Sequence, residues 1–170
     1  LEFRRLLVRS TVPVITGFYG VTAEHNVLTF GRGGSDYAAA VVANALNADM
    51  LEIWTDVDGF MSADPRIEKG AVKIDEMTYA EASELAYFGA KVLHPRTIEP
   101  VRKKHIPLKV RNSFKPDEPG TLISQFRKSK AELLRSVAAK TDLSILTISS
   151  PEIAYRPDIT AKILSKISEN

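Results

Sequence analysis

Residues 28–37 have the sequence Leu28-Thr29-Phe30-Gly31-Arg32-Gly33-Gly34-Ser35-Asp36-Tyr37. The stretch joins the end of a short apolar run to a glycine-rich turn and then to an Ala-rich segment. Glycines let a backbone approach a ligand closely, and the free N–H groups at a helix start favour an anion. This stretch therefore predicts a strand, a turn and a helix, with a candidate anion-binding site at the turn.

The segments on either side of this turn predict an α/β fold. Residues 12–18 form an apolar run, which predicts a buried strand. Residues 36–48 are Ala-rich and apolar all round, which predicts a helix buried on most sides. Residues 50–57 predict a second buried strand. The order strand, turn, helix, strand is a βαβ unit, and such units build parallel sheets.

Helices and strands continue to alternate in the second half of the chain. Thr78 and Glu81 form a capping-box pattern, so a helix is expected to start at Thr78 and to stop at Gly89. Pro95 suits the first turn of another helix, which should run to about Lys104. Strands are expected at 106–110 and 121–124.

The chain changes character after residue 124. Residues 125–134 are polar and charged, which is typical of a linker. Residues 136–149 alternate in hydropathy and predict a strand pair or one long strand. Asp158 is expected to cap an amphipathic helix with four apolar residues on one face: Ile159, Ile163, Leu164 and Ile167.

Composition excludes several classes of function. The 170 residues include 23 Lys and Arg and 21 Asp and Glu, a net charge of +2, so charge gives no reason to expect nucleic-acid binding. There is no cysteine, which excludes disulfides and zinc–thiolate sites. No apolar run approaches the roughly 20 residues of a membrane span. The three histidines, His25, His94 and His105, make no metal-ligand pattern.

A second motif follows the strand expected at 50–57. It consists of Trp54-Thr55-Asp56-Val57-Asp58-Gly59-Phe60, with Asp64-Pro65-Arg66 beyond it. Open α/β sheets bind ligands at the carboxyl ends of their strands, where this motif lies. A calcium loop is rejected because the EF-hand spacing and its terminal Glu are absent. A turn whose Asp side chains bond their own backbone remains an alternative.

Each remaining candidate residue also has a plainer explanation. Arg32 offers a guanidinium fork suited to carboxylate or phosphate, but Ser35 or Asp36 could simply cap the helix. A third motif, Phe88-Gly89-Ala90-Lys91-Val92-Leu93-His94-Pro95, places Lys91 after a tight glycine turn. Lys91 could face a phosphate there, or it could be an ordinary solvent-exposed lysine.

Taken together, the motifs resemble the successive signatures of the aspartate kinases, members of the amino-acid kinase family. The resemblance rests on Gly-Arg-Gly-Gly-Ser-Asp-Tyr, Ile-Trp-Thr-Asp-Val-Asp-Gly, Ala-Asp-Pro-Arg, Phe-Gly-Ala-Lys-Val-Leu-His-Pro-Arg-Thr and Pro-Gly-Thr-Leu-Ile, which cover about Val12 to Ser124 in the family's order. Related kinases of acetylglutamate, glutamate or UMP share the fold but are not expected to carry both the first and third motifs. The stretch from Ser136 resembles the first strand and helix of an ACT domain.

This resemblance implies ATP-dependent phosphorylation of the L-aspartate β-carboxylate to 4-phospho-L-aspartate, the first step of lysine, threonine and methionine biosynthesis. It implies a catalytic role for Asp36 and substrate binding by Arg32, Gly33, Gly34 and Ser35. The implied nucleotide-binding residues are Thr55, Asp56, Arg66, Lys91 and Val92. Met61 stands where members of the family often have Tyr, so it is left out of this set.

The implied fold is an α/β/α sandwich with a parallel sheet, of the carbamate kinase-like type, followed by an incomplete α+β ACT domain. The expected domains are residues 1–125 for the nucleotide-binding half of the kinase, 126–135 for a linker and 136–170 for the start of the ACT domain. The family's Lys-Phe-Gly-Gly-Thr-Ser loop and its substrate-binding glutamate are absent from the 170 residues. The sequence is therefore expected to be truncated and inactive by itself.

The expected partners are L-aspartate and ATP, with Mg²⁺ arriving as part of the ATP complex and no protein-bound metal. A feedback amino acid is expected at the ACT region, and a homodimer or higher homo-oligomer in a cytoplasmic location. No nucleic acid and no membrane are expected as partners. The alternatives are another kinase of the same family, acting on acetylglutamate, glutamate or UMP, and a non-catalytic regulatory fragment.

Overall fold

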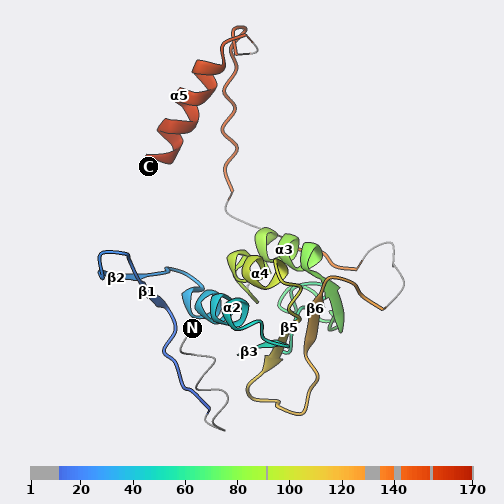
Figure 1. Cartoon of the computed structure of the whole chain (residues 1–170). Coiled ribbons are helices and arrows are strands. Elements are labelled where there is room, and N and C mark those ends of the chain that lie inside the picture. The colour runs from blue at the N-terminus through green and yellow to red at the C-terminus, as the bar shows by residue number, and fades with distance from the viewer. Residues whose placement is uncertain (1–11, 91, 129–134, 140–142, 154, 170) are drawn as a thin grey trace. The chain divides into compact units, whose positions relative to one another are not determined.

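A computed structural model describes residues 12–90, 92–128, 135–139, 143–153 and 155–169 of the chain. The chain divides into two compact units, residues 1–140 and residues 141–170. Among the described residues, the first unit contains a four-stranded sheet, a separate two-stranded hairpin and three helices, and the second contains one helix (Figure 1).

The main sheet has the strand order β3 (Leu51–Thr55), β5 (Leu108–Asn112), β6 (Thr121–Ser124), β4 (Glu76–Thr78). The β3–β5 and β4–β6 pairs are parallel, whereas β5 and β6 are antiparallel. The sheet is therefore mixed rather than wholly parallel. The reason is the short connection at residues 113–120, because a parallel pair needs a longer crossover between its strands.

Three helices of the first unit pack with this sheet: α2 (Gly34–Leu46), α3 (Tyr79–Phe88) and α4 (Pro95–Arg102). The α/β class expected from the sequence is thus confirmed. Alternate strand residues point into the core, including Ile53, Leu108, Val110 and Ile123. Their neighbours point to the other face, on which Trp54 keeps 44% of its surface exposed.

Local sequence signals set most helix ends as expected. Thr78 caps α3 in a complete capping box with Glu81, and Gly89 closes the same helix with a φ of 135°. Pro95 occupies the first turn of α4, and the His94 side chain caps that helix by accepting a hydrogen bond from the Arg96 N–H at 3.3 Å.

The segment before the glycine turn differs from its prediction. Residues 12–17 form no strand, and Val12 and Val14 are largely exposed. A hairpin of β1 (Tyr19–Val21) and β2 (Val27–Thr29) follows, so β2 pairs with β1 and not with the main sheet. The βαβ unit predicted from residues 28–30 is therefore wrong, because the short turn at residues 22–26 lets the chain fold back on itself.

Helix α2 is also less buried than its composition suggests. Ala40 and Ala43 are buried, but Val41 keeps 41% of its surface exposed. Among the described residues α2 packs mainly against α4 on one flank, so this Ala-rich helix presents part of its apolar surface to solvent.

The second unit contains α5 (Pro157–Ser168), close to the predicted helix. Its N-cap is Arg156 and not Asp158, which lies in the first turn and pairs with the Arg156 guanidinium at 2.8 Å. The strand predicted within residues 136–149 is not formed by the described residues 136–139 and 143–149. A strand needs partners along its whole length, and in this described stretch the Val137 N–H bonds to the Ser62 carbonyl at 2.8 Å while no residue joins either sheet.

Candidate active site

The glycine turn starts α2 without help from a side chain. Gly33 is the N-cap, with φ 71° and ψ 16°, and no side chain forms a capping hydrogen bond. The turn is closed by the backbone, since the Gly34 N–H donates to the Gly31 carbonyl at 3.0 Å. The alternative that Ser35 or Asp36 merely caps the helix is therefore wrong. Without a capping side chain, the start of α2 keeps N–H groups available to an anion.

Gly33 also allows a close contact between two segments distant in sequence. Its positive φ favours glycine, and a Cβ there would lie 2.5 Å from the Cβ of His94. Any larger residue would push His94 away. The glycine turn and the residues that begin α4 therefore form one surface.

Seven residues line an open hollow of about 490 Å³ at this turn, namely Phe18, Gly31, Arg32, Gly33, Gly34, Ser35 and Asp36. Arg32 and Ser35 are exposed, whereas Asp36 is half-buried in the first turn of α2. Burial raises the pKa of the Asp36 carboxyl above its ordinary value. The hollow thus combines an exposed guanidinium, a hydroxyl, backbone donors and one partly desolvated carboxylate.

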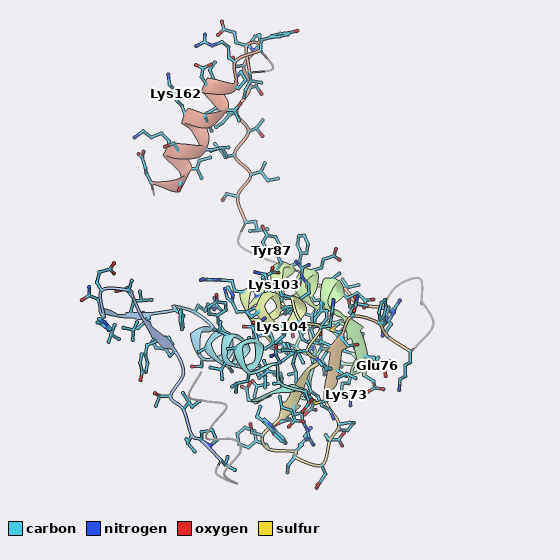
Figure 2. The ribbon with its side chains drawn as sticks, viewed as in Figure 1. Lys73, Glu76, Tyr87, Lys103, Lys104 and Lys162 are labelled. Carbon is cyan, nitrogen blue, oxygen red and sulfur yellow. The ribbon has the colours of Figure 1, made fainter. Side chains whose placement is uncertain are left out.

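The start of α4 lies beside the start of α2. The Arg96 guanidinium is 5.1 Å from the centre of the Tyr37 ring, a cation–π contact. At the opposite end of the pair, Lys104, which is labelled in Figure 2, donates to the Asn44 carbonyl at 2.6 Å and to the Asn47 side chain. The helices therefore run parallel, with their starts together. Each is followed by a strand of the parallel β3–β5 pair, so both starts lie toward the carboxyl ends of those strands.

Thr55 and Asp56 lie at the carboxyl end of β3. The Thr55 hydroxyl donates to the Asp56 carboxylate at 3.1 Å, and the Thr55 carbonyl accepts from the Ser113 N–H at 2.8 Å. Asp56 is exposed. Arg66 is also exposed, and its guanidinium pairs with Asp64 at 2.6 Å.

Part of this motif is a turn in which an Asp side chain accepts a hydrogen bond from the nearby backbone, as the alternative interpretation expected. The Asp64 carboxylate accepts from the Arg66 N–H at 2.9 Å, as such a turn requires. Asp58 is different, because its side chain accepts from Asn112 and from Lys115, both more than fifty residues away. These two hydrogen bonds, that of Lys115 first, hold the pKa of the Asp58 carboxyl below its ordinary value.

Asn112 and Lys115 contact this motif through Asp58, and the sequence alone did not reveal either contact. Asn112 is the last residue of β5 and is only 5% exposed. Asn112 lies two residues beyond the strand expected at 106–110, so no local signal in the sequence pointed to it. Its partner could not be known, because the pairing of β3 with β5 is a long-range feature.

The structure brings the predicted residues together in two groups. Arg32 to Asp36 surround the hollow at α2, while Thr55 ends β3 and Asp56 follows it. Val92 is half-buried against the core, and Lys91 lies outside the described residues. Among the described residues no cluster of three or more His, Asp or Glu is placed to hold a metal ion. In the same part of the chain no helix is long and apolar enough to cross a membrane.

An α/β sheet with two adjacent helix starts and a hollow at a glycine turn is an arrangement that can accept an anionic ligand. Residues 2–112 match the model of the amino acid kinase family, and the chain belongs to that family. Within it, the chain is 40% identical over 159 residues to Aspartokinase 1, chloroplastic, of Arabidopsis thaliana, a match that covers 93% of this chain and 28% of that protein.

Solved structures point the same way. The structure of E. coli aspartokinase III in complex with aspartate and ADP has a TM-score of 0.67 and 46% identity, over 72% of this chain and 27% of that one. The aspartate kinase of Clostridium acetobutylicum has a TM-score of 0.70 and 40% identity, over 81% of this chain and 32% of that one. E. coli aspartokinase III is also similar in a complex with lysine and aspartate, with a TM-score of 0.58. The chain thus spans about a third or less of these relatives.

Proposed function

We propose that the protein containing this chain is an aspartate kinase. The observation that carries the proposal is the uncapped glycine turn at α2, with Arg32 and half-buried Asp36 at one hollow, in a chain whose relatives are aspartokinases. In the reaction, an oxygen of the aspartate β-carboxylate attacks the γ-phosphorus of ATP. The bond from that phosphorus to the β,γ-bridging oxygen breaks, and ADP leaves with the bonding electrons.

Arg32 and the turn Gly33, Gly34 and Ser35 are proposed to hold the amino-acid substrate. A guanidinium and several backbone N–H groups match the two carboxylates of aspartate. Asp36 is proposed as the carboxylate that orients the cationic groups around the transferring phosphoryl. Phosphoryl transfer depends on positioning and charge neutralisation more than on covalent chemistry, so a fixed carboxylate of this kind is useful there.

The nucleotide is proposed to lie at the carboxyl end of β3. Thr55 and Asp56 offer a hydroxyl and an exposed carboxylate, and Arg66, Lys91 and Val92 complete the proposed set. E. coli aspartokinase III has been solved in complex with aspartate and ADP. That complex supports the proposal that the protein containing this chain binds both an amino acid and a nucleotide. Mg²⁺ enters bound to the ATP phosphates, as part of the substrate.

The domain assignment is part of the same proposal. We assign residues 1–125 to the nucleotide-binding half of the kinase, 126–135 to a linker and 136–170 to the start of an ACT domain. The lysine complex of E. coli aspartokinase III supports a feedback amino acid as an effector of the whole protein. A homo-oligomer and a cytoplasmic location remain predictions from the family resemblance.

The test is a substrate panel with the full-length protein that contains this chain. ADP formation from MgATP is measured with L-aspartate, N-acetylglutamate, glutamate and UMP as separate acceptors. Aspartate should support turnover well above the ATPase background, and the other three should not. Turnover with another acceptor but not with aspartate would replace the proposal with another kinase of the same family.

A further inference from the structure

Asp58 is held from two sides by residues of the segment that ends and follows β5. The buried Asn112 amide donates to Asp58 Oδ1, and Lys115 Nζ lies 2.8 Å from Asp58 Oδ2. Asn112 Oδ1 in turn accepts from the Phe114 N–H at 2.9 Å. That second bond fixes which way the amide is turned, so its NH₂ group faces Asp58.

The Asp58 contacts fall at the centre of a turn whose two ends are also fixed. At one end Thr55 pairs with Asn112 in the parallel ladder. At the other end Gly59 has a φ of 133°, and a Cβ there would lie 2.4 Å from Thr121 Oγ1. The same hydroxyl accepts from the Phe60 N–H at 2.8 Å. Between these fixed ends, Asp58 is the one side chain of residues 56–58 that hydrogen-bonds to a distant part of the chain among the described residues.

We propose that Asn112 and Lys115 clamp Asp58 and thereby set the position of Thr55 and Asp56 for a nucleoside di- or triphosphate. Asn112 is a positioning residue, since it acts through Asp58 and not on the nucleotide itself. This inference rests on the proposed function, because it takes the nucleotide to lie against Thr55 and Asp56.

The two oxygens of the Asp58 carboxylate explain why it can bind an amide and an ammonium group at once. An ionised carboxylate accepts at both oxygens, and each of these donors supplies one bond, the Lys115 bond being charge-assisted. The Asn112 bond is screened from water, whereas Lys115 is more than half exposed. Loss of Asn112 should therefore release the turn more completely than loss of Lys115.

The experiment compares Asn112→Ala with Asn44→Ala in the full-length protein. Asn44 is a partly buried asparagine that also donates across elements, to the Pro100 carbonyl, but lies at the far end of α2. Asn112→Ala should raise the KM for ATP about tenfold, as expected for one lost buried hydrogen bond, and leave the KM for aspartate within about twofold. Asn44→Ala should lower the melting temperature without moving either KM.

An exchange of the two groups gives an independent test. Asn112→Asp alone sets two carboxylates against each other and should raise the KM for ATP further than Asn112→Ala does. Combining it with Asp58→Asn restores one amide and one carboxylate, and the KM for ATP should fall back toward that of the wild type. A double variant no better than Asn112→Asp would overturn the clamp, and this comparison decides the matter if Asn112→Ala does not fold.

Two variants distinguish the position of the nucleotide from the clamp on Asp58. If Asp56→Ala raises the KM for ATP while Asn112→Ala leaves it unchanged, the clamp is wrong and the proposed nucleotide position stands. If neither variant changes the KM for ATP, the nucleotide lies elsewhere and both proposals fail.

Discussion

At the scale of single residues, Asp36 carries the strongest prediction. Its carboxyl is half-buried, and burial raises its pKa. A raised pKa in the folded state means that stability falls as pH rises from the ordinary value of 3.8 through the folded pKa. Above that window the ionised carboxylate opposes folding, so Asp36→Asn should not lower the melting temperature at neutral pH.

The same substitution should strongly reduce catalysis. Removing one preorganised electrostatic element from a phosphoryl-transfer site should lower kcat by about 100-fold or more. Melting curves and steady-state kinetics of Asp36→Asn in the full-length protein check both parts. If kcat stays within about threefold of wild type while the melting temperature is unchanged, Asp36 has no catalytic role.

A second prediction compares the loss of stability on replacing Gly33 with that on replacing Gly31. Both have a positive φ, but a Cβ at Gly31 meets nothing within 4 Å, whereas one at Gly33 meets His94. Gly31→Ala should cost about 1–2 kcal/mol of unfolding free energy from the backbone alone. Gly33→Ala should cost clearly more, as measured by denaturant unfolding. Equal losses of unfolding free energy in the two variants would show that the contact between the turn and His94 is not tight.

At the scale of helices and strands, Glu81 links the start of α3 to the chain beyond β6. One oxygen accepts from the Thr78 N–H at 2.7 Å, completing the capping box. The other lies 3.0 Å from Arg127 Nη1 and 3.4 Å from Arg135 Nη1. Arg135 also donates to the carbonyl of Glu76, the first residue of β4, which is labelled in Figure 2. The carboxylate therefore ties residues before and after position 130 to the same helix.

A third prediction concerns pH. Burial pushes the pKa of Glu81 upward, but the Thr78 hydrogen bonds and the two arginines outweigh it, so the pKa is lowered from its ordinary value of 4.5. The ionised form thus stabilises the fold above about that pH, and the contribution is lost as pH falls through the folded pKa. Glu81→Gln should cost about 1–3 kcal/mol at neutral pH. Denaturant unfolding should show this difference shrinking below pH 4.5; a difference constant down to acid pH would contradict it.

Sequence predicted those elements whose signals are local. Thr78 with Glu81, the stop at Gly89 and Pro95 in a first helical turn each depend on neighbours within a few residues, and all three are confirmed. The hairpin at residues 19–29 and the antiparallel β5–β6 pair were missed, because both depend on which strands meet.

In the candidate site, too, the local features were predicted from sequence and the long-range contacts were not. The glycine turn was identified from its own residues, since glycine tolerance of positive φ and free N–H groups are local properties. The role of Asn112 and the contact of His94 with Gly33 were not foreseen, because they join segments more than fifty residues apart. A single sequence gives no measure of such distances.

At the scale of the whole molecule, the 170 residues are expected to be insufficient for turnover. They contain no Lys-Phe-Gly-Gly-Thr-Ser loop, which the family resemblance places on the phosphates. Missing charge stabilisation at a transferring phosphoryl typically costs about 100-fold or more in rate. A purified polypeptide of these residues should therefore form no aspartate-dependent ADP above a control preparation. Measurable turnover would show that the loop is dispensable.

Trapping the product of the full-length protein tests directly whether it phosphorylates the aspartate β-carboxylate. An acyl phosphate reacts with hydroxylamine to give a hydroxamate, whereas a phosphate ester or free phosphate does not. With MgATP, L-aspartate and hydroxylamine, aspartyl β-hydroxamate should form in a one-to-one ratio with ADP, and neither should form without aspartate. ADP released in the presence of aspartate with no hydroxamate would contradict phosphorylation of the β-carboxylate, and with it the assignment of this chain to an aspartate kinase.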